Sequence, residues 1–126
     1  MAALTFNDAH LKDSWNSERI SERLRFVLRS LGVKYDGIVV TCLDRDKKHN
    51  KSVGGVLHSK HVPENNWSGK CEAADFVLVN SIPPADVLSY CKDHLHYVDV
   101  IYHDVGSGKH FHLECDPPKA LHVEIV

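Results

Sequence analysis

Three stretches of the sequence carry side chains that can bind a metal ion. Zinc accepts imidazole nitrogen, carboxylate oxygen and thiolate sulfur in a tetrahedral shell. His61 and Asp75 could supply two such ligands, and the His-rich stretch at residues 110–114 could supply a third. Two histidines and one aspartate would leave a fourth position open for water. That arrangement is typical of a catalytic zinc site rather than a structural one.

The stretch at residues 110–114 also has the alternation expected of a β-strand. In an extended strand, every second side chain points to the same face. His110, His112 and Glu114 would therefore share one face, while Phe111 and Leu113 would point into a core. We expect this strand to bring a polar, metal-binding face to the site.

The candidate ligands belong to a longer ordered pattern. It consists of Arg45, Asn50, Gly54-Gly55, Ser59-x-His61, Gly69, Ala73-x-Asp75 and His110-x-His112. This pattern resembles that of the zinc D-alanyl-D-alanine peptidases of the M15 type, which act on the peptide stems of bacterial cell walls. These enzymes share a core with the hedgehog signalling domain. The resemblance covers residues 36–114, which is most of the chain.

The resemblance implies roles for individual side chains. His61, Asp75 and His112 would hold Zn²⁺, and His110 would lie in the active site and assist the transition state. Arg45 would bind a substrate carboxylate, a task suited to a planar fork that is always charged. Ser59 would form hydrogen bonds within the site that support the metal or the substrate.

The sequence departs from the family pattern in two places. Residues 62–68, which include Trp67, lengthen the usual gap between His61 and Asp75. An insert of this kind is tolerable as a surface loop and could reshape substrate choice. The family's general base is a carboxylate three residues before the last histidine ligand, where this sequence has Lys109. Glu114, Asp104 and His110 are the remaining candidates for that base, and we select His110 and Glu114 as catalytic residues.

Composition excludes several classes of function. The chain has 126 residues, 43% of them hydrophobic, and a formal net charge of −2. A chain this short forms one domain, and its charge gives no bulk attraction to nucleic acid. No stretch approaches the roughly 20 apolar residues of a membrane span. The four cysteines form no Cys-x-x-Cys pair, and the N-terminus has no secretory signal, so we expect reduced thiols and a cytoplasmic location as synthesised.

The hydrophobic pattern predicts an α+β domain over residues 1–126. Its small, largely antiparallel sheet would pack with two or more helices, as in hedgehog and D,D-peptidase folds. The first 15 residues are expected to be an irregular lead-in, and residues 44–52 a polar loop. Helices are predicted at 17–31, ending at Gly32, and at 84–93. Strands are predicted at 37–41, 73–79, 97–102 and 110–115, with a glycine-rich turn at 105–108 and a short edge strand at 121–126.

The leading hypothesis is a zinc-dependent peptidase that acts on peptidoglycan stem peptides as a D,D-carboxypeptidase or endopeptidase. The lack of a signal fits a lysis protein of a bacteriophage or prophage that reaches the cell wall by a separate route. The alternative is a non-catalytic metal-binding interaction module on the same fold, which Lys109 in the base position favours. A third interpretation is an α+β domain with scattered histidines and no metal.

Overall fold

The computed structural model describes residues 3–55, 58–104 and 108–117. Within them the chain forms an α+β fold with one five-stranded sheet and four α-helices. In chain order the elements are β1 (Leu4–Phe6), α1 (Ala9–Trp15), α2 (Glu22–Lys34), β2 (Ile38–Cys42), α3 (Lys47–Ser52), a 3₁₀ turn (Pro63–Asn65), β3 (Ala73–Leu78), α4 (Pro84–His94), β4 (Val98–His103) and β5 (His110–Cys115).

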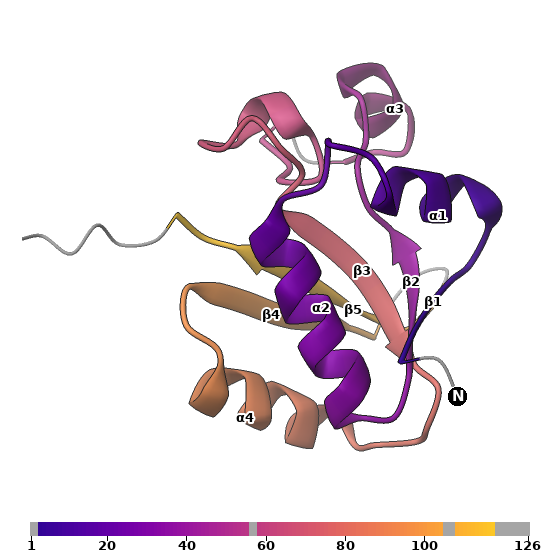
Figure 1. The fold of residues 1–126 in the computed structure, drawn as a ribbon, viewed down its shortest axis with the longest axis vertical. Coiled ribbons are helices and arrows are strands. Elements are labelled where there is room, and N and C mark those ends of the chain that lie inside the picture. Colours follow the sequence, from indigo (N-terminus) through magenta and orange to yellow (C-terminus); the bar gives the residue numbers. More distant parts are fainter. Residues whose placement is uncertain (1–2, 56–57, 105–107, 118–126) are drawn as a thin grey trace, which may run out of the picture.

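The strands lie in the order β1-β2-β3-β5-β4. β1 runs parallel to β2, and the other three pairings are antiparallel, which confirms the prediction of a largely antiparallel sheet. Helices α2 and α4 lie together on one face of this sheet (Figure 1). The central position of β3, with β2 on one side and β5 on the other, determines where the site forms.

The hydrophobic core fills the space between the sheet and the helices. Leu24, Leu28 and Leu31 of α2 are fully buried and share one helix face because they are spaced by three and four residues. They belong to one cluster with Phe76 of β3 and Leu113 of β5. Burying side chains of this size contributes about 1.5–3 kcal/mol each relative to exposure. The core therefore fixes the strands that carry the polar face.

Helix α2 begins and ends later than its sequence pattern indicates. The cap is Ser21, whose hydroxyl accepts from the backbone N–H of Leu24 at 3.0 Å, so the helix begins at Glu22 and not at residue 17. The prediction that Gly32 ends the helix is wrong, because α2 continues to Lys34. Gly32 instead allows close packing: a Cβ atom there would lie 2.3 Å from the carbonyl oxygen of Ala3. The glycine lets the chain before β1 lie against the helix.

The expected irregular lead-in at residues 1–15 is also wrong, since it contains β1 and α1. Strand β1 is held by its parallel pairing with β2, and Asp8 caps α1 by accepting from the N–H of Leu11 at 2.9 Å. The polar loop predicted at 44–52 includes the short helix α3, capped by Asp46. The turn at 105–108 falls mostly, and the strand at 121–126 entirely, outside the described residues.

Candidate metal centre

Three neighbouring strands place one side chain each in a row across the sheet. Asp75 of β3 lies opposite Cys42 of β2 and opposite His112 of β5. Phe76, the next residue of β3, belongs to the core, so Asp75 points to the face away from α2 and α4. The row therefore lies on the face that the two helices leave uncovered.

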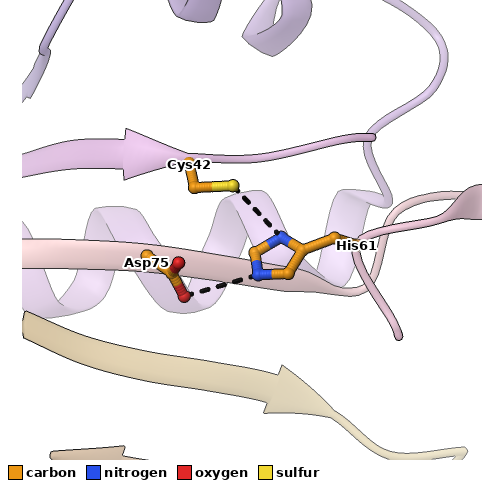
Figure 2. Close-up of side chains that lie close together, drawn as sticks. All are labelled: Cys42, His61 and Asp75. Carbon is orange, nitrogen blue, oxygen red and sulfur yellow. Dashed lines mark hydrogen bonds and ion pairs between the residues drawn. The ribbon is translucent and has the colours of Figure 1, made fainter. Parts of the chain in front are cut away.

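His61 reaches this row from the segment before β3. Its ring is buried, and its Nδ1 lies 2.6 Å from the carbonyl oxygen of Leu43. A carbonyl oxygen only accepts, so Nδ1–H donates to it and the neutral ring keeps its lone pair on Nε2. That Nε2 atom lies 3.4 Å from Oδ1 of Asp75 (Figure 2). The hydrogen bond from Nδ1 to Leu43 thus leaves Nε2 as the nitrogen that can bind a ligand at the site.

The loop carrying His61 is fixed by its backbone. The carbonyl of His61 accepts from the N–H of Arg45 at 2.9 Å, and its N–H donates to the hydroxyl of Ser59 at 3.2 Å. The carbonyls of the two preceding residues accept from the side chains of Asn65 and Asn66. Ser59 is itself buried, so it supports the backbone of His61 from behind.

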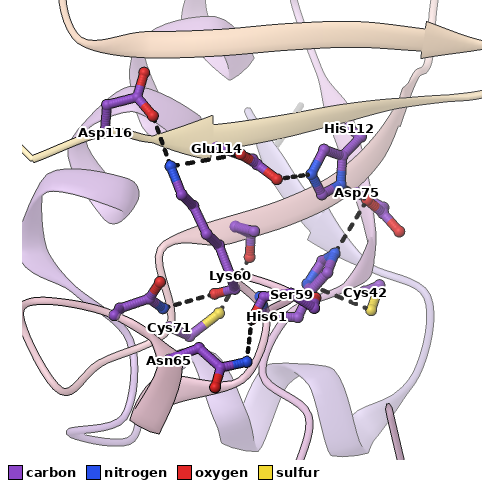
Figure 3. Close-up of polar contacts among 12 residues, drawn as sticks. Cys42, Ser59, Lys60, His61, Asn65, Cys71, Asp75, His112, Glu114 and Asp116 are labelled. Atoms are coloured by element: carbon purple, nitrogen blue, oxygen red, sulfur yellow. Dashed lines mark hydrogen bonds and ion pairs between the residues drawn. The ribbon is translucent and has the colours of Figure 1, made fainter. Parts of the chain in front are cut away.

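His112 completes a pair of imidazoles around one carboxylate. Its Nδ1 lies 2.8 Å from Oδ1 of Asp75, the same oxygen that faces His61. Its Nε2 lies 2.9 Å from Oε1 of Glu114, two residues along the same strand face (Figure 3). The ring centroids of His61 and His112 are 5.2 Å apart. The structure thus brings together all three residues that the sequence predicts as ligands.

The electrostatics of this cluster favour an ionised carboxylate at Asp75. Burial raises the pKa of Asp75, but hydrogen bonds from His112 and His61 outweigh it and hold the pKa well below its usual range. Burial lowers the pKa of His61, yet its hydrogen bond with Asp75 and its contacts with the thiols of Cys42 and Cys71 raise it well above its usual value. The pKa of His112 is likewise raised, because Asp75 and Glu114 offset the effect of burial.

The donor set fits a divalent metal ion. Two imidazole nitrogens converge on one carboxylate, and Asp75 is only 8% exposed. The two imidazole rings contact the buried carboxylate in this structure, and a divalent cation bound among the same donors can balance its charge. Nitrogen and oxygen donors of this kind suit zinc.

The other predicted residues lie at the rim of this cluster. Nε2 of His110 is 3.8 Å from Oδ2 of Asp75, and Nη2 of Arg45 is 4.0 Å from the same oxygen. Lys109, in the position where the family pattern has its base, lies outside the cluster. Its ammonium group pairs with Asp104 at 3.2 Å, and its side chain is 70% exposed.

Arg45 is oriented by the glycine-containing turn after α3. Its Nη1 donates to Oδ1 of Asn50 at 3.3 Å. Asn50 is buried, and a Cβ atom on Gly55 would lie only 2.0 Å from Oδ1 of Asn50. Glycine at this position therefore allows the turn to approach the asparagine that holds the guanidinium.

Sequence reasoning missed two residues that the fold brings to the site. The Sγ atom of Cys42 lies 3.7 Å from Nδ1 of His61, and the ring of His103 lies 5.1 Å from that of His110. Strand alternation with a hairpin register could have found His103, which pairs with His110. Cys42 had no such signal, because a register shift between Val40 and Cys42 places it opposite Asp75.

A second acidic cluster lies nearby but contains its own cation. Asp99, Glu114 and Asp116 come close enough together to bind an ion. The ammonium group of Lys60 already lies 2.6 Å from Asp116 and 3.5 Å from Glu114 (Figure 3). The lysine thus offsets part of the negative charge of this cluster and ties the segment before His61 to β5.

The sequence profile of the family described as Peptidase M15 matches residues 5–114. The chain belongs to the peptidase M15 family. Neither the curated proteins nor the solved structures contain a match. The matched region includes all the residues of the cluster around Asp75, so membership of this peptidase family and the site geometry concern the same part of the chain. None of the helices in the described parts of the chain has the length and apolar character required to cross a membrane.

Two hollows lie near the strands of the candidate centre in this M15 family member. One, of about 450 Å³, is lined in part by Tyr102, His110 and Phe111. The other, of about 670 Å³, is lined in part by Cys42 and Arg45. Tyr102 and Phe111 belong to the core side of their strands, so the first hollow lies mainly on the helix-covered side, whereas the second borders the row at Cys42 and Arg45.

Proposed function

We propose that this protein is a zinc-dependent peptidase that cleaves the peptide stems of peptidoglycan. The observation that carries the proposal is the buried carboxylate of Asp75, which lies between the imidazoles of His61 and His112 on an open face of the sheet. Family membership supports peptide hydrolysis, and M15 peptidases are generally zinc-dependent. The ordered motif around Arg45, His61 and Asp75 supports a cell-wall substrate.

His61, Asp75 and His112 would hold the metal, and Glu114 would fix the ring of His112. Zinc bound there would act as a Lewis acid that polarises the scissile carbonyl. It would also lower the pKa of a water molecule, so that the water loses a proton more easily and attacks that carbonyl. The protein's own task is to keep these three donors aligned. The hydrogen bonds from His61 to Leu43 and between His112 and Glu114 do so by fixing both rings.

His110 is the best-placed group for proton transfer. Its Nδ1 lies 3.2 Å from the carbonyl oxygen of Gly108, so Nδ1–H donates and the neutral ring keeps a lone pair on Nε2. That atom faces Asp75 from the rim of the cluster, where a substrate can reach it. Glu114 is already paired with His112 and Lys60, and Asp104 with Lys109. His110 would therefore accept the proton of the attacking water and pass it to the leaving amine.

The positions of Arg45 and His110 suggest how a peptide would lie. Arg45 borders the hollow on the β2 side and would receive the substrate's terminal carboxylate. The remaining stem peptide would extend past His110, which lies at the rim of the cluster. This orientation favours carboxypeptidase action, in which the residue removed is held by its own carboxylate.

The first experiment is metal analysis by mass spectrometry on untagged protein and on His61→Ala and Asp75→Ala. We expect about one zinc per chain in the unsubstituted protein and loss of zinc in both variants. Lys109→Ala is the matched control and should retain zinc. Protein that contains no zinc and takes up none when it is added would overturn the proposed metal centre.

The second experiment is digestion of purified muropeptides by the zinc-loaded protein, with products identified by mass spectrometry. We expect the unsubstituted protein to release a terminal D-alanine. The His110→Ala variant should release none at saturating zinc. Retained zinc without cleavage of any muropeptide would favour the alternative, a metal-binding interaction module. Cleavage within a cross-link instead of at a free carboxylate would make the enzyme an endopeptidase.

A further inference from the structure

We propose that Cys42 is a fourth protein ligand of the metal, so that the substrate-free centre is Cys42, His61, Asp75 and His112. This inference rests on the metal centre proposed above and goes beyond its three expected ligands. Its first support is the position of the cysteine. One ligand atom each from Cys42, His61 and Asp75 lies within 4.8 Å of the others (Figure 2).

The β-bulge in β2 gives the second support. Val40 pairs with Phe76, so regular pairing would place Thr41 opposite Asp75. The register shift places Cys42 there instead. A bulge inserts one extra residue and re-aims the side chains that follow it. The irregularity therefore adds a thiol to the row that contains Asp75 and His112.

The distances are compatible with a shared ion. With a metal–sulfur bond of about 2.3 Å and metal–nitrogen and metal–oxygen bonds of about 2.1 Å, tetrahedral ligand atoms lie roughly 3.3–3.6 Å apart. Nε2 of His61 lies 3.4 Å from Oδ1 of Asp75, whereas the sulfur of Cys42 lies 3.7 Å from Nδ1, the other nitrogen of that ring. Coordination therefore requires the Cys42 side chain to rotate from Nδ1 of His61 towards Nε2, the nitrogen that faces Asp75.

The four cysteines differ in a way that singles out Cys42. It is partly exposed, whereas Cys71, Cys91 and Cys115 are buried. Cys71 also contacts His61, but its thiol is directed to the carbonyl oxygen of Ala73 at 3.1 Å. Cys42 is thus the thiol that borders both His61 and the solvent-accessible hollow beside Arg45.

Coordination by Cys42 would change the character of the centre. The thiol would lose its proton to solvent as the metal–sulfur bond forms. A thiolate favours soft ions such as Cd²⁺ over ions that prefer oxygen donors. Four protein ligands also fill a tetrahedral shell, so the water needed for the proposed hydrolysis would bind as a fifth ligand or in place of the thiolate.

The test is the absorption spectrum of the full chain loaded with Co²⁺ in place of zinc. A cobalt–thiolate bond gives a charge-transfer band in the near ultraviolet that nitrogen and oxygen ligands do not give. We expect this band in the unsubstituted protein, its loss in Cys42→Ala and its retention in the matched control Cys91→Ala. We also expect Cys42→Ala to weaken Cd²⁺ binding at least about tenfold, equivalent to ~1.4 kcal/mol.

A measurement on the unsubstituted protein keeps the test valid if Cys42→Ala does not fold. Alkylation of Cys42 by iodoacetamide, followed by peptide mass spectrometry, should slow markedly when Zn²⁺ is added, because a bound thiolate is a poor nucleophile. Cobalt binding without the thiolate band, or a band lost in Cys71→Ala and kept in Cys42→Ala, would overturn the role of Cys42. Failure to bind cobalt or zinc at all would instead overturn the metal centre itself.

Discussion

Asp75 and His112 face each other across the β3–β5 pairing, with Oδ1 of the aspartate 2.8 Å from Nδ1 of the histidine. Their separation is therefore set by strand register rather than by a loop. Directly opposed residues of antiparallel strands keep their Cβ atoms about 4.5–5.5 Å apart. His61 comes from a loop instead, and backbone hydrogen bonds at Arg45 and Ser59 hold it in place. The sheet thus fixes the positions of two of the proposed ligands, Asp75 and His112.

Glu114→Gln separates a positioning role from a catalytic one. Glu114 accepts from His112 at 2.9 Å and pairs with Lys60, so we expect it to orient the histidine. Zinc affinity should fall about 10–100-fold, as is usual for a partner of a metal-ligating histidine. Isothermal titration measures this, with exposed Glu18→Gln as the control. At saturating zinc, kcat should change little, and a loss of about 100-fold or more would make Glu114 the base.

Arg45→Lys tests the proposed carboxylate anchor. The guanidinium contacts Asn50 with Nη1 and lies 4.0 Å from Asp75 with Nη2, and one ammonium group cannot reproduce this fork. We expect KM for a stem peptide to rise about tenfold, or ~1.4 kcal/mol, with kcat nearly unchanged. Steady-state kinetics measure both constants. Arg29→Lys on α2 is the control, and an equal effect there would contradict the assignment.

Gly32→Ala should destabilise the protein although it lies within a helix. An alanine in place of glycine usually stabilises a helix interior by about 1 kcal/mol. Here the new Cβ would lie 2.3 Å from the carbonyl oxygen of Ala3, which also accepts from the N–H of Ile38. We expect the free energy of unfolding to fall by about 1–3 kcal/mol in urea denaturation. Gly108→Ala has open space around its Cβ and should have a much smaller effect.

Alkaline pH should weaken the fold through two buried thiols. Burial raises the pKa of Cys91 to about 11 and that of Cys115 to about 12. The folded state therefore keeps protons that the unfolded state releases above about pH 9. The free energy of unfolding should fall as pH rises from about 9 to 11 and should be insensitive to these groups near pH 7. Urea denaturation under reducing conditions measures this, and Cys91→Ala should show a shallower fall than the unsubstituted protein.

Much of the fold could be predicted from hydrophobic periodicity. Strands β3 and β5 and helix α4 lie within one residue of their predicted bounds because their alternating or helical patterns match the faces they bury. The first 15 residues gave no such pattern. β1 is only three residues long, and α1 buries few side chains, so pairing with β2 and a capping aspartate decide their structure.

The site was predictable only in part. The motif order and strand alternation placed His61, Asp75 and His112 together, and the structure brings them into one cluster. Alternation alone did not reveal that Glu114 would pair with His112, or that Lys109 would pair with Asp104 at the surface. Cys42 could not be predicted as a site residue, because the bulge that places it opposite Asp75 has no reliable sequence signature. A one-residue slip in pairing reverses the face of every side chain that follows.

The division of the sheet into a helix-covered face and an open face has an evolutionary consequence. Phe76 and Leu113 lie in the core, while their neighbours Asp75 and His112 lie on the site face. A substitution at the edge of that open face, for example at the half-exposed Ile101, removes little buried surface. Selection can therefore vary the lining around the centre while foldability is maintained by the opposite side of the same strands.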